Sequence, residues 1–261
     1  MHLTVGSKLE HNDWTGLEVQ PTIRFAWTPD DHRTLWAAVS RAVRTPSRLD
    51  EDIEFVVGGR VVLQGSPDFV SEKLIAYELG YRVQPDPRLS LDAAAFYNVY
   101  NDLRSQELQP DGRIVLANEL DAETWGLELR ANCQLLSWWR LQAGATWLEK
   151  HLRLDPGSTD PTGGQGEGND PPSRFSLRSM IDLPHGVELD AWLRYVDRLP
   201  APVVPAYLTL DLHLGWKVVR SLELALVGQN LLAPRHAEFG PATASREEIE
   251  RGVYGKATWH F

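Results

Sequence analysis

Hydrophobic and polar residues alternate along much of this chain with a period of two residues. In residues 207–217 every second residue is a leucine or a tryptophan, and most of the residues between them are polar. The last ten residues, 252–261, alternate in the same way and end on Phe261. A period of two predicts extended strands with one apolar and one polar face.

The alternation predicts about twelve antiparallel strands. They cover residues 2–10, 18–28, 33–43, 72–84, 89–99, 119–135, 140–151, 174–183, 187–197, 207–217, 222–227 and 252–261. Short turns alternate with long polar segments, the longest of which are 44–71, 101–118, 155–172 and 232–250. Tight turns at one end and long loops at the other are typical of transmembrane β-barrels of the outer membrane.

The tryptophans support a barrel, because they gather near the ends of the predicted strands. Those beside short turns or the C-terminus are Trp27, Trp36, Trp138, Trp139, Trp216 and Trp259, and those nearer the long segments are Trp14, Trp125 and Trp147. A bilayer selects two such aromatic girdles. The polar parity also carries charged residues such as Arg82, Arg130 and Asp211. These would be buried in a soluble sandwich, whereas they can line a wet or filled lumen.

Composition narrows the class of protein further. The chain has 261 residues, a formal net charge of −10 and one cysteine, Cys133. The acidic balance argues against nucleic acid as a partner, since nucleic-acid-binding proteins carry a basic surface. No apolar run approaches the roughly 18 residues of a membrane helix. The strand pattern begins directly after Met1 without a signal peptide, so an exported protein implies an incomplete chain or a wrong start codon.

Several segments together resemble the C-terminal half of a TonB-dependent outer-membrane receptor. They are residues 36–46, which end in Arg-Thr-Pro, residues 65–69 with Glu72, and residues 91–100, 126–129, 228–232 and 259–261. Each is weak alone, but their order and their places on strands and loops make the resemblance specific over nearly the whole chain.

This resemblance implies a 22-stranded barrel that is filled by an N-terminal plug and coupled to the TonB complex. Residues 1–261 would then be the C-terminal portion of that barrel, without about ten strands, the plug domain, the TonB box and the signal peptide. The implied function is active uptake of a scarce nutrient across the outer membrane of a Gram-negative bacterium. A ferric siderophore is the default substrate, with cobalamin or another chelate as alternatives. The implied partners also include outer-membrane lipid and the barrel-assembly machinery.

Candidate functional residues follow from the same picture. Arg41, Arg44 and Arg48 lead from a strand into the first long segment, where they could meet an anionic ligand or pair with lumen carboxylates. Tyr100, Arg104 and His236 are comparable candidates from neighbouring segments. The acidic run 50–52 could be a solvated loop or part of the ligand mouth. The other set is at the C-terminus, where Val253, Gly255, Trp259 and Phe261 resemble the signal read by the barrel-assembly machinery.

Catalysis and metal binding are not favoured. Thr209, Asp211 and His213 share one face of a predicted strand, but neighbours two apart are about 7 Å from each other, too far for a catalytic triad. No histidine pair has metal-ligand spacing, so we expect no enzyme, cofactor or metal centre. Two other hypotheses stay open: a complete twelve-stranded channel or phospholipase-like barrel, whose first and last strands would pair, and a soluble β-sandwich binding module.

Overall fold

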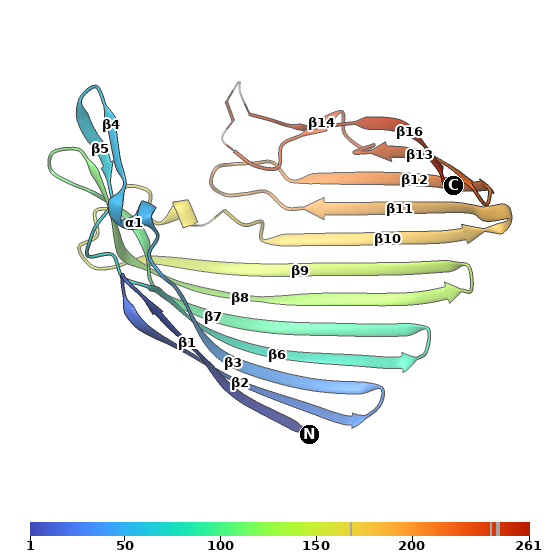
Figure 1. Cartoon of the computed structure of the whole chain (residues 1–261), viewed down its shortest axis with the longest axis horizontal. Coiled ribbons are helices and arrows are strands. Elements are labelled where there is room, and N and C mark those ends of the chain that lie inside the picture. The colour runs from blue at the N-terminus through green and yellow to red at the C-terminus, as the bar shows by residue number, and fades with distance from the viewer. Residues whose placement is uncertain (168, 241, 244–245) are drawn as a thin grey trace.

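The computed structural model describes residues 1–167, 169–240, 242–243 and 246–261. Its main feature is a 14-stranded sheet in which twelve antiparallel strands lie side by side in chain order (Figure 1). These strands are β1 (His2–Asn12), β2 (Gly16–Asp30), β3 (Arg33–Arg44), β6 (Glu72–Asp86), β7 (Leu89–Leu108), β8 (Ile114–Leu136), β9 (Trp139–Leu154), β10 (Ser173–Leu183), β11 (Val187–Val196), β12 (Tyr207–Val219), β13 (Leu222–Gln229) and β16 (Gly252–Trp259). The predicted all-β fold with about twelve strands is confirmed.

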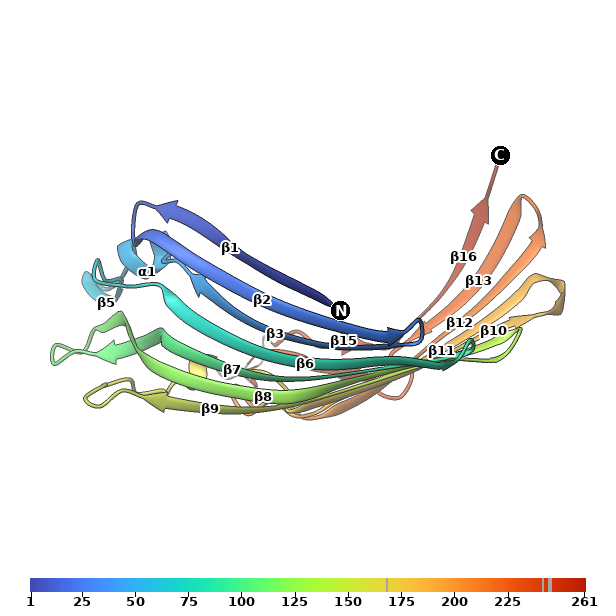
Figure 2. The same ribbon diagram turned by 90° about the horizontal axis from the view of Figure 1, so that it is seen from below.

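The sheet curves into an open trough with β1 and β16 at its two edges (Figure 2). Within the described residues, β1 pairs only with β2 and β16 only with β13. A closed twelve-stranded barrel is therefore wrong for this chain. The soluble sandwich is wrong as well, because all the long strands belong to one sheet rather than to two packed layers.

Strand pairing aligns the alternating residues of neighbouring strands. Val5 pairs with Ile23 and Ile23 pairs with Val39, so apolar side chains continue from strand to strand on one side, which we call the apolar face. One residue out of phase, Arg82 pairs with Asp92 on the opposite side, the polar face. Large hydrophobic side chains exposed on the apolar face include Leu3, Ile23, Tyr77, Leu127, Leu214 and Val253. Both predicted faces are confirmed.

Trp36 departs from the predicted aromatic girdle. It pairs with Gly80 and lies on the polar face, one residue out of phase with the apolar side chains of β3. A Cβ atom on Gly80 would lie 2.2 Å from Cε2 of Trp36, so glycine is needed for the indole to lie flat across β6. The position beside a short turn was predicted correctly, but the turn does not decide which face a side chain takes.

The segment 101–118 was expected to be a loop, and this is wrong. β7 and β8 continue through it and pair as far as Leu108 and Ile114, leaving a turn around Gly112. The register shifts between Tyr100 and Leu103, where Asp102 has a φ of 57°. A bulge of this kind lets a strand bend while the ladder resumes beyond it. Polar composition alone therefore concealed a long hairpin that extends past the neighbouring strands.

The other long segments form the rim, by which we mean residues 44–71, 101–118, 155–172, 197–206 and 230–251. Short elements lie in or beside these segments and in the turns: α1 (Arg48–Asp52), β4 (Glu54–Val57), β5 (Arg60–Gln64), η1 (Gln165–Glu167), η2 (Pro184–Gly186), β14 (Arg235–His236) and β15 (Ile249–Glu250). All except η2, which makes a short turn, are on the long-loop side. β5 pairs with β4 and also, in parallel, with β8 through Leu63 and Ile114.

The buried core lies in and beside the rim rather than inside the sheet. The buried apolar residues larger than alanine, within the described ranges, are Phe69, Leu116, Leu120, Leu199 and Val204. Phe69, Leu199 and Val204 come from loops, and Leu116 and Leu120 from the extended end of β8. None of the helices that the structure describes is long and apolar enough to cross a membrane.

Candidate functional site

Asp50 anchors the first long segment to the sheet. Its carboxylate has no exposed surface. Oδ2 accepts hydrogen bonds from Nη1 of Arg44 (2.9 Å) and from the backbone N (2.9 Å) and Oγ (2.8 Å) of Ser47, while Nη1 of Arg104 lies 3.6 Å from Oδ1. Burial favours the neutral acid, but the hydrogen bonds from Ser47 and Arg44 outweigh it and hold the pKa of Asp50 below its ordinary value. The acidic run is therefore only partly a solvated loop.

Glu72 joins the same cluster from the first residue of β6. Arg44 donates to both of its carboxylate oxygens, with Nε at 2.7 Å from Oε2, and the backbone N of Arg104 donates to Oε1 at 3.0 Å. The Arg44 guanidinium also lies over the ring of Phe69, 5.9 Å from its centroid. We call Arg44, Ser47, Asp50, Glu72 and Arg104 the Arg44 network. It ties the ends of β3, β6 and β7 to the first long segment.

A second network ties the long hairpin to residues 155–172. Glu107, near the end of β7, accepts hydrogen bonds from the hydroxyl of Ser158 (2.9 Å) and from the amide and hydroxyl of Thr159. Asp160 accepts one from the backbone N of Gln106 (2.9 Å). We call these five residues the Glu107 network. Burial opposes ionisation of Glu107, but hydrogen bonds from Ser105, Thr159 and Ser158 lower its pKa.

The six predicted mouth residues do not converge on one place. Arg44 and Arg104 meet in the Arg44 network, which is held together within the protein. Arg48 lies on α1, 84% exposed, with Nε 3.3 Å from Asp52. Arg41 lies just beyond Thr22 and Ser40, where the pairing of β2 with β3 stops. Its Nη1 donates a hydrogen bond to the carbonyl oxygen of Val19. Arg48 and Arg41 therefore have different surroundings.

Tyr100 and His236 lie apart from those arginines. Tyr100 lines a hollow of about 320 Å³ with Lys150 and Asp170. His236, in β14, stacks on Tyr207 with ring centroids 4.2 Å apart, and its Nε2 lies 3.1 Å from Glu238. Because β12 is many strands from β3 in the sheet, His236 cannot share a small ligand with Arg44.

The C-terminal residues take the positions expected of a final strand. Val253, Gly255 and Trp259 pair with Gly228, Leu226 and Leu222 of β13, which places them on the apolar face. Phe261 follows the strand with its ring fully exposed. Their role as an assembly signal stays a prediction.

Sequence reasoning missed a basic hollow on the polar face. It has a volume of about 280 Å³, and Arg130, Arg174, Arg194 and Glu128 line it. Arg194 binds Asp211 at 2.7 Å and lies 4.4 Å from the Trp192 ring centroid. Among the described residues, neither Arg130 nor Arg174 forms an ion pair. The sequence places these arginines on the polar parity, but the register that brings β8, β10 and β11 together is visible only in the structure.

The polar face as a whole is an array of paired charges. Arg82 binds Asp92 at 2.6 Å and Arg178 binds Asp190 at 2.9 Å across neighbouring strands. The described residues hold no cluster of three or more His, Cys, Asp or Glu side chains that could bind a metal ion. His213 lies on this face and pairs with Asp190 rather than facing lipid.

A family model described as TonB dependent receptor-like, beta-barrel matches residues 2–231. The chain belongs to this receptor family. Members of the TonB-dependent receptor family are β-barrels of the outer membrane of Gram-negative bacteria, and this chain is accordingly an outer-membrane protein.

Similar proteins include the pesticin receptor of Yersinia enterocolitica, which is 27% identical over 183 residues and 66% of this chain. The chain spans 26% of that receptor's length. A mutant ferric enterobactin receptor from Pseudomonas aeruginosa has a similar structure, with a TM-score of 0.77 at 17% identity, over 99% of this chain and 42% of that one. The ferric yersiniabactin uptake receptor of Yersinia pestis gives 0.68 at 19% identity, over 94% and 38%. At these identities the structural likeness shows the fold of this TonB-dependent receptor barrel.

Proposed function

We propose that this chain forms barrel wall and ligand-binding rim in a receptor that takes up a ferric siderophore or a related chelate with energy from the TonB complex. The observation that carries the proposal is the contrast between the two faces of one sheet. An uninterrupted apolar face suits lipid, and a face of paired charges beneath a rim of anchored loops suits a wet or filled interior. The chain's own role is binding and passage, without covalent chemistry.

The basic hollow supports an anionic substrate. Arg130 and Arg174 offer guanidinium groups that no described carboxylate neutralises, next to Arg194. Planar guanidinium groups bind carboxylates and similar oxygen anions with two parallel hydrogen bonds. The similar proteins named above are receptors for ferric enterobactin and ferric yersiniabactin, which supports iron chelates as the first substrates to test. A copper transporter with a TM-score of 0.71 makes copper the appropriate competing metal.

Uptake of radiolabelled iron tests this proposal. Cells with the gene deleted should lose uptake of at least one ferric chelate and grow poorly under iron limitation, and the cloned gene should restore both. Dissipating the proton-motive force should abolish uptake without abolishing surface binding. Unchanged uptake of every ferric chelate tested, together with unchanged growth, would refute iron transport, and loss of copper uptake alone would reassign the metal.

The hollow is tested with a matched pair of arginines. Arg130→Gln combined with Arg174→Gln should weaken chelate binding at least about 100-fold, since it removes two charge-assisted hydrogen bonds that each contribute about 1.5–3 kcal/mol. Arg82→Gln, which removes an arginine already paired with Asp92, should leave binding nearly unchanged. Equal effects of the two changes would show that the hollow does not contact the chelate.

A further inference from the structure

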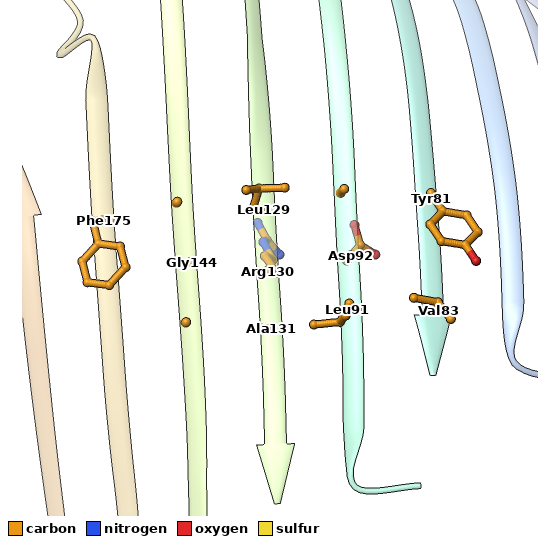
Figure 3. A pocket seen from close by; sticks show the side chains of 12 residues that line it. Tyr81, Val83, Leu91, Asp92, Leu129, Arg130, Ala131, Gly144 and Phe175 are labelled. Carbon is orange, nitrogen blue, oxygen red and sulfur yellow. The ribbon is translucent and has the colours of Figure 1, made fainter. Parts of the chain in front are cut away.

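The apolar face is not smooth but carries a groove near the short-turn end. The groove has a volume of about 510 Å³. Figure 3 shows Tyr81 on β6 and Phe175 on β10 at its two sides, with Leu91 and Leu129 on the strands between them. Almost all the side chains that this face contributes to the groove are hydrocarbon, the hydroxyl of Tyr81 being the exception.

The strand register explains the groove. One row of paired residues alternates in size, as Ala93 pairs with Leu129, Leu129 with Ala145, and Ala145 with Phe175. In the next row towards the short turns, Ala131 pairs with Ala143, so two small residues lie side by side on β8 and β9. Three alanines therefore lower the surface over two adjacent strands, and the aromatic rings stand above it on either side.

The environment of the groove follows from its position. It is continuous with the apolar face that lies in the outer membrane, and it lies towards the short turns, which face the periplasm in barrels of this kind. The occupant must therefore come from the periplasmic half of the bilayer. A solvated or ionic ligand does not fit, since the groove lacks charged side chains on this face.

An aromatic pair marks the membrane boundary beneath the groove. Trp138 and Trp139 lie at the turn between the same two strands, with ring centroids 6.2 Å apart. The indole nitrogen of Trp139 donates to Oγ of Ser179 at 2.9 Å, which fixes its ring. Trp139 and Ala143 are four residues apart on β9, so they are about 13 Å apart along the strand. Tryptophan rings settle at the level of lipid head groups.

We propose that this groove is a binding site for one acyl chain of a glycerophospholipid in the periplasmic leaflet. The glycerol region lies level with Trp138 and Trp139, and the chain passes over Cys133 and Leu141 into the trough between Tyr81 and Phe175. The groove begins about 13 Å along the strand from the tryptophan pair. An occupant with a polar group level with the tryptophans and a hydrocarbon chain in the groove fits this spacing. The site is distinct from the polar face and does not depend on the transported substrate.

Photo-crosslinking tests the site. Outer-membrane vesicles from cells that make the protein are loaded with phosphatidylethanolamine bearing a diazirine in the middle of one acyl chain. After illumination, adducts are mapped by peptide mass spectrometry. They should concentrate on the segments around residues 91–93, 129–131 and 143–145, rather than spread over the apolar face.

Two substitutions of the same size provide the comparison. Ala143→Phe fills the groove and should lower adduct formation there about ten-fold, the effect of losing roughly two buried methylenes. Ala191→Phe, on the apolar face outside the groove, should leave the groove adducts unchanged. If Ala143→Phe reduces insertion into the membrane, judged by heat-modifiable migration on gels, Ala145→Leu replaces it with a smaller filling change.

The outcomes separate the occupants. Adducts spread evenly over the apolar face, or groove adducts that Ala143→Phe leaves unchanged, would mean ordinary boundary lipid and overturn the proposal. Protein–protein adducts through the groove would assign it to a second copy of the chain and overturn it as well.

Discussion

The wall, by which we mean the twelve long strands of the sheet, and the rim are stabilised by different interactions. In the wall, most side chains on both sides are exposed or half-buried, and the strands are joined by backbone ladders with charge pairs such as Arg178 with Asp190. In the rim, Asp50 has no exposed surface and Val204 is only 1% exposed. A barrel wall needs no core of its own, because lipid covers one face and the contents of the lumen cover the other.

The rim, in contrast, must hold its shape in water. Loops of this length are usually mobile unless they bury side chains of their own. The Arg44 and Glu107 networks meet this need with buried carboxylates, each held by several hydrogen bonds from chain segments that are far apart in sequence. The rim therefore behaves like a small soluble domain attached to a membrane wall.

The largest expected effect comes from breaking the rim at Asp50. Asp50→Asn should destabilise the first long segment by about 3–5 kcal/mol, because it removes the buried charge that accepts hydrogen bonds from Arg44 and Ser47, each worth about 1.5–3 kcal/mol. Asp52→Asn is the matched control, since Asp52 is 61% exposed and pairs with the exposed Arg48. Its cost should stay below about 1 kcal/mol. Protease sensitivity of residues 44–71 measures both, and equal cleavage of the two variants would contradict the anchoring role.

The wall is tested by placing the same charge on its two faces. Ala95 and Ala94 are neighbours on β7, with Ala95 between Leu79 and Leu127 and Ala94 between Gly80 and Glu128. Ala95→Arg should cost about 2–4 kcal/mol near the middle of the bilayer. Ala94→Arg should cost far less, because it meets Glu128 on the polar face. Urea unfolding in lipid vesicles reports the difference, and similar values would show that the faces are assigned wrongly.

A smaller effect is expected from the pH dependence of Glu107. Its pKa in the folded state is lowered, so its contribution to stability is complete above the ordinary carboxyl pKa of about 4.3 and is lost as the pH falls through the lowered value. The protection of the Thr159 amide, which donates to Glu107, against hydrogen exchange (its rate relative to an unfolded peptide at the same pH) should therefore fall in acid below about pH 4.3. In Glu107→Gln this protection should no longer change over that range. A change that persists unaltered in the variant would contradict the role of Glu107.

Much of the wall could be predicted from the sequence, because a period of two is a local signal that long strands repeat. The strand at 207–217 was predicted within two residues of its observed end at Val219. Trp36 shows the limit, since the room for its ring on the polar face depends on Gly80, which faces it across the strand pair. The position of a residue along its strand could be predicted from the sequence, but its packing against residues of neighbouring strands could not.

The rim could not be predicted in the same way. Asp50 and Arg104 are on different segments, and their meeting depends on how the first long segment folds back onto β7 beyond the bulge at Asp102. The polar residues of 101–118 suggested a loop. Most of this segment instead forms the ends of β7 and β8, which pair with each other. Arg44 and Arg104 both lie in the rim, and their partners there are carboxylates of the chain itself. Their contribution to ligand binding stays a prediction.

The parallel pairing of β5 with β8 also bears on the order of events during folding. β6 and β7 lie between Leu63 and its partner Ile114 in the chain, so this contact closes a long chain loop. Such closure is entropically expensive and slow compared with the formation of neighbouring hairpins. The first long segment is therefore expected to fold after the strands that it covers have paired. It would be the last part of the N-terminal half of the rim to reach its final conformation.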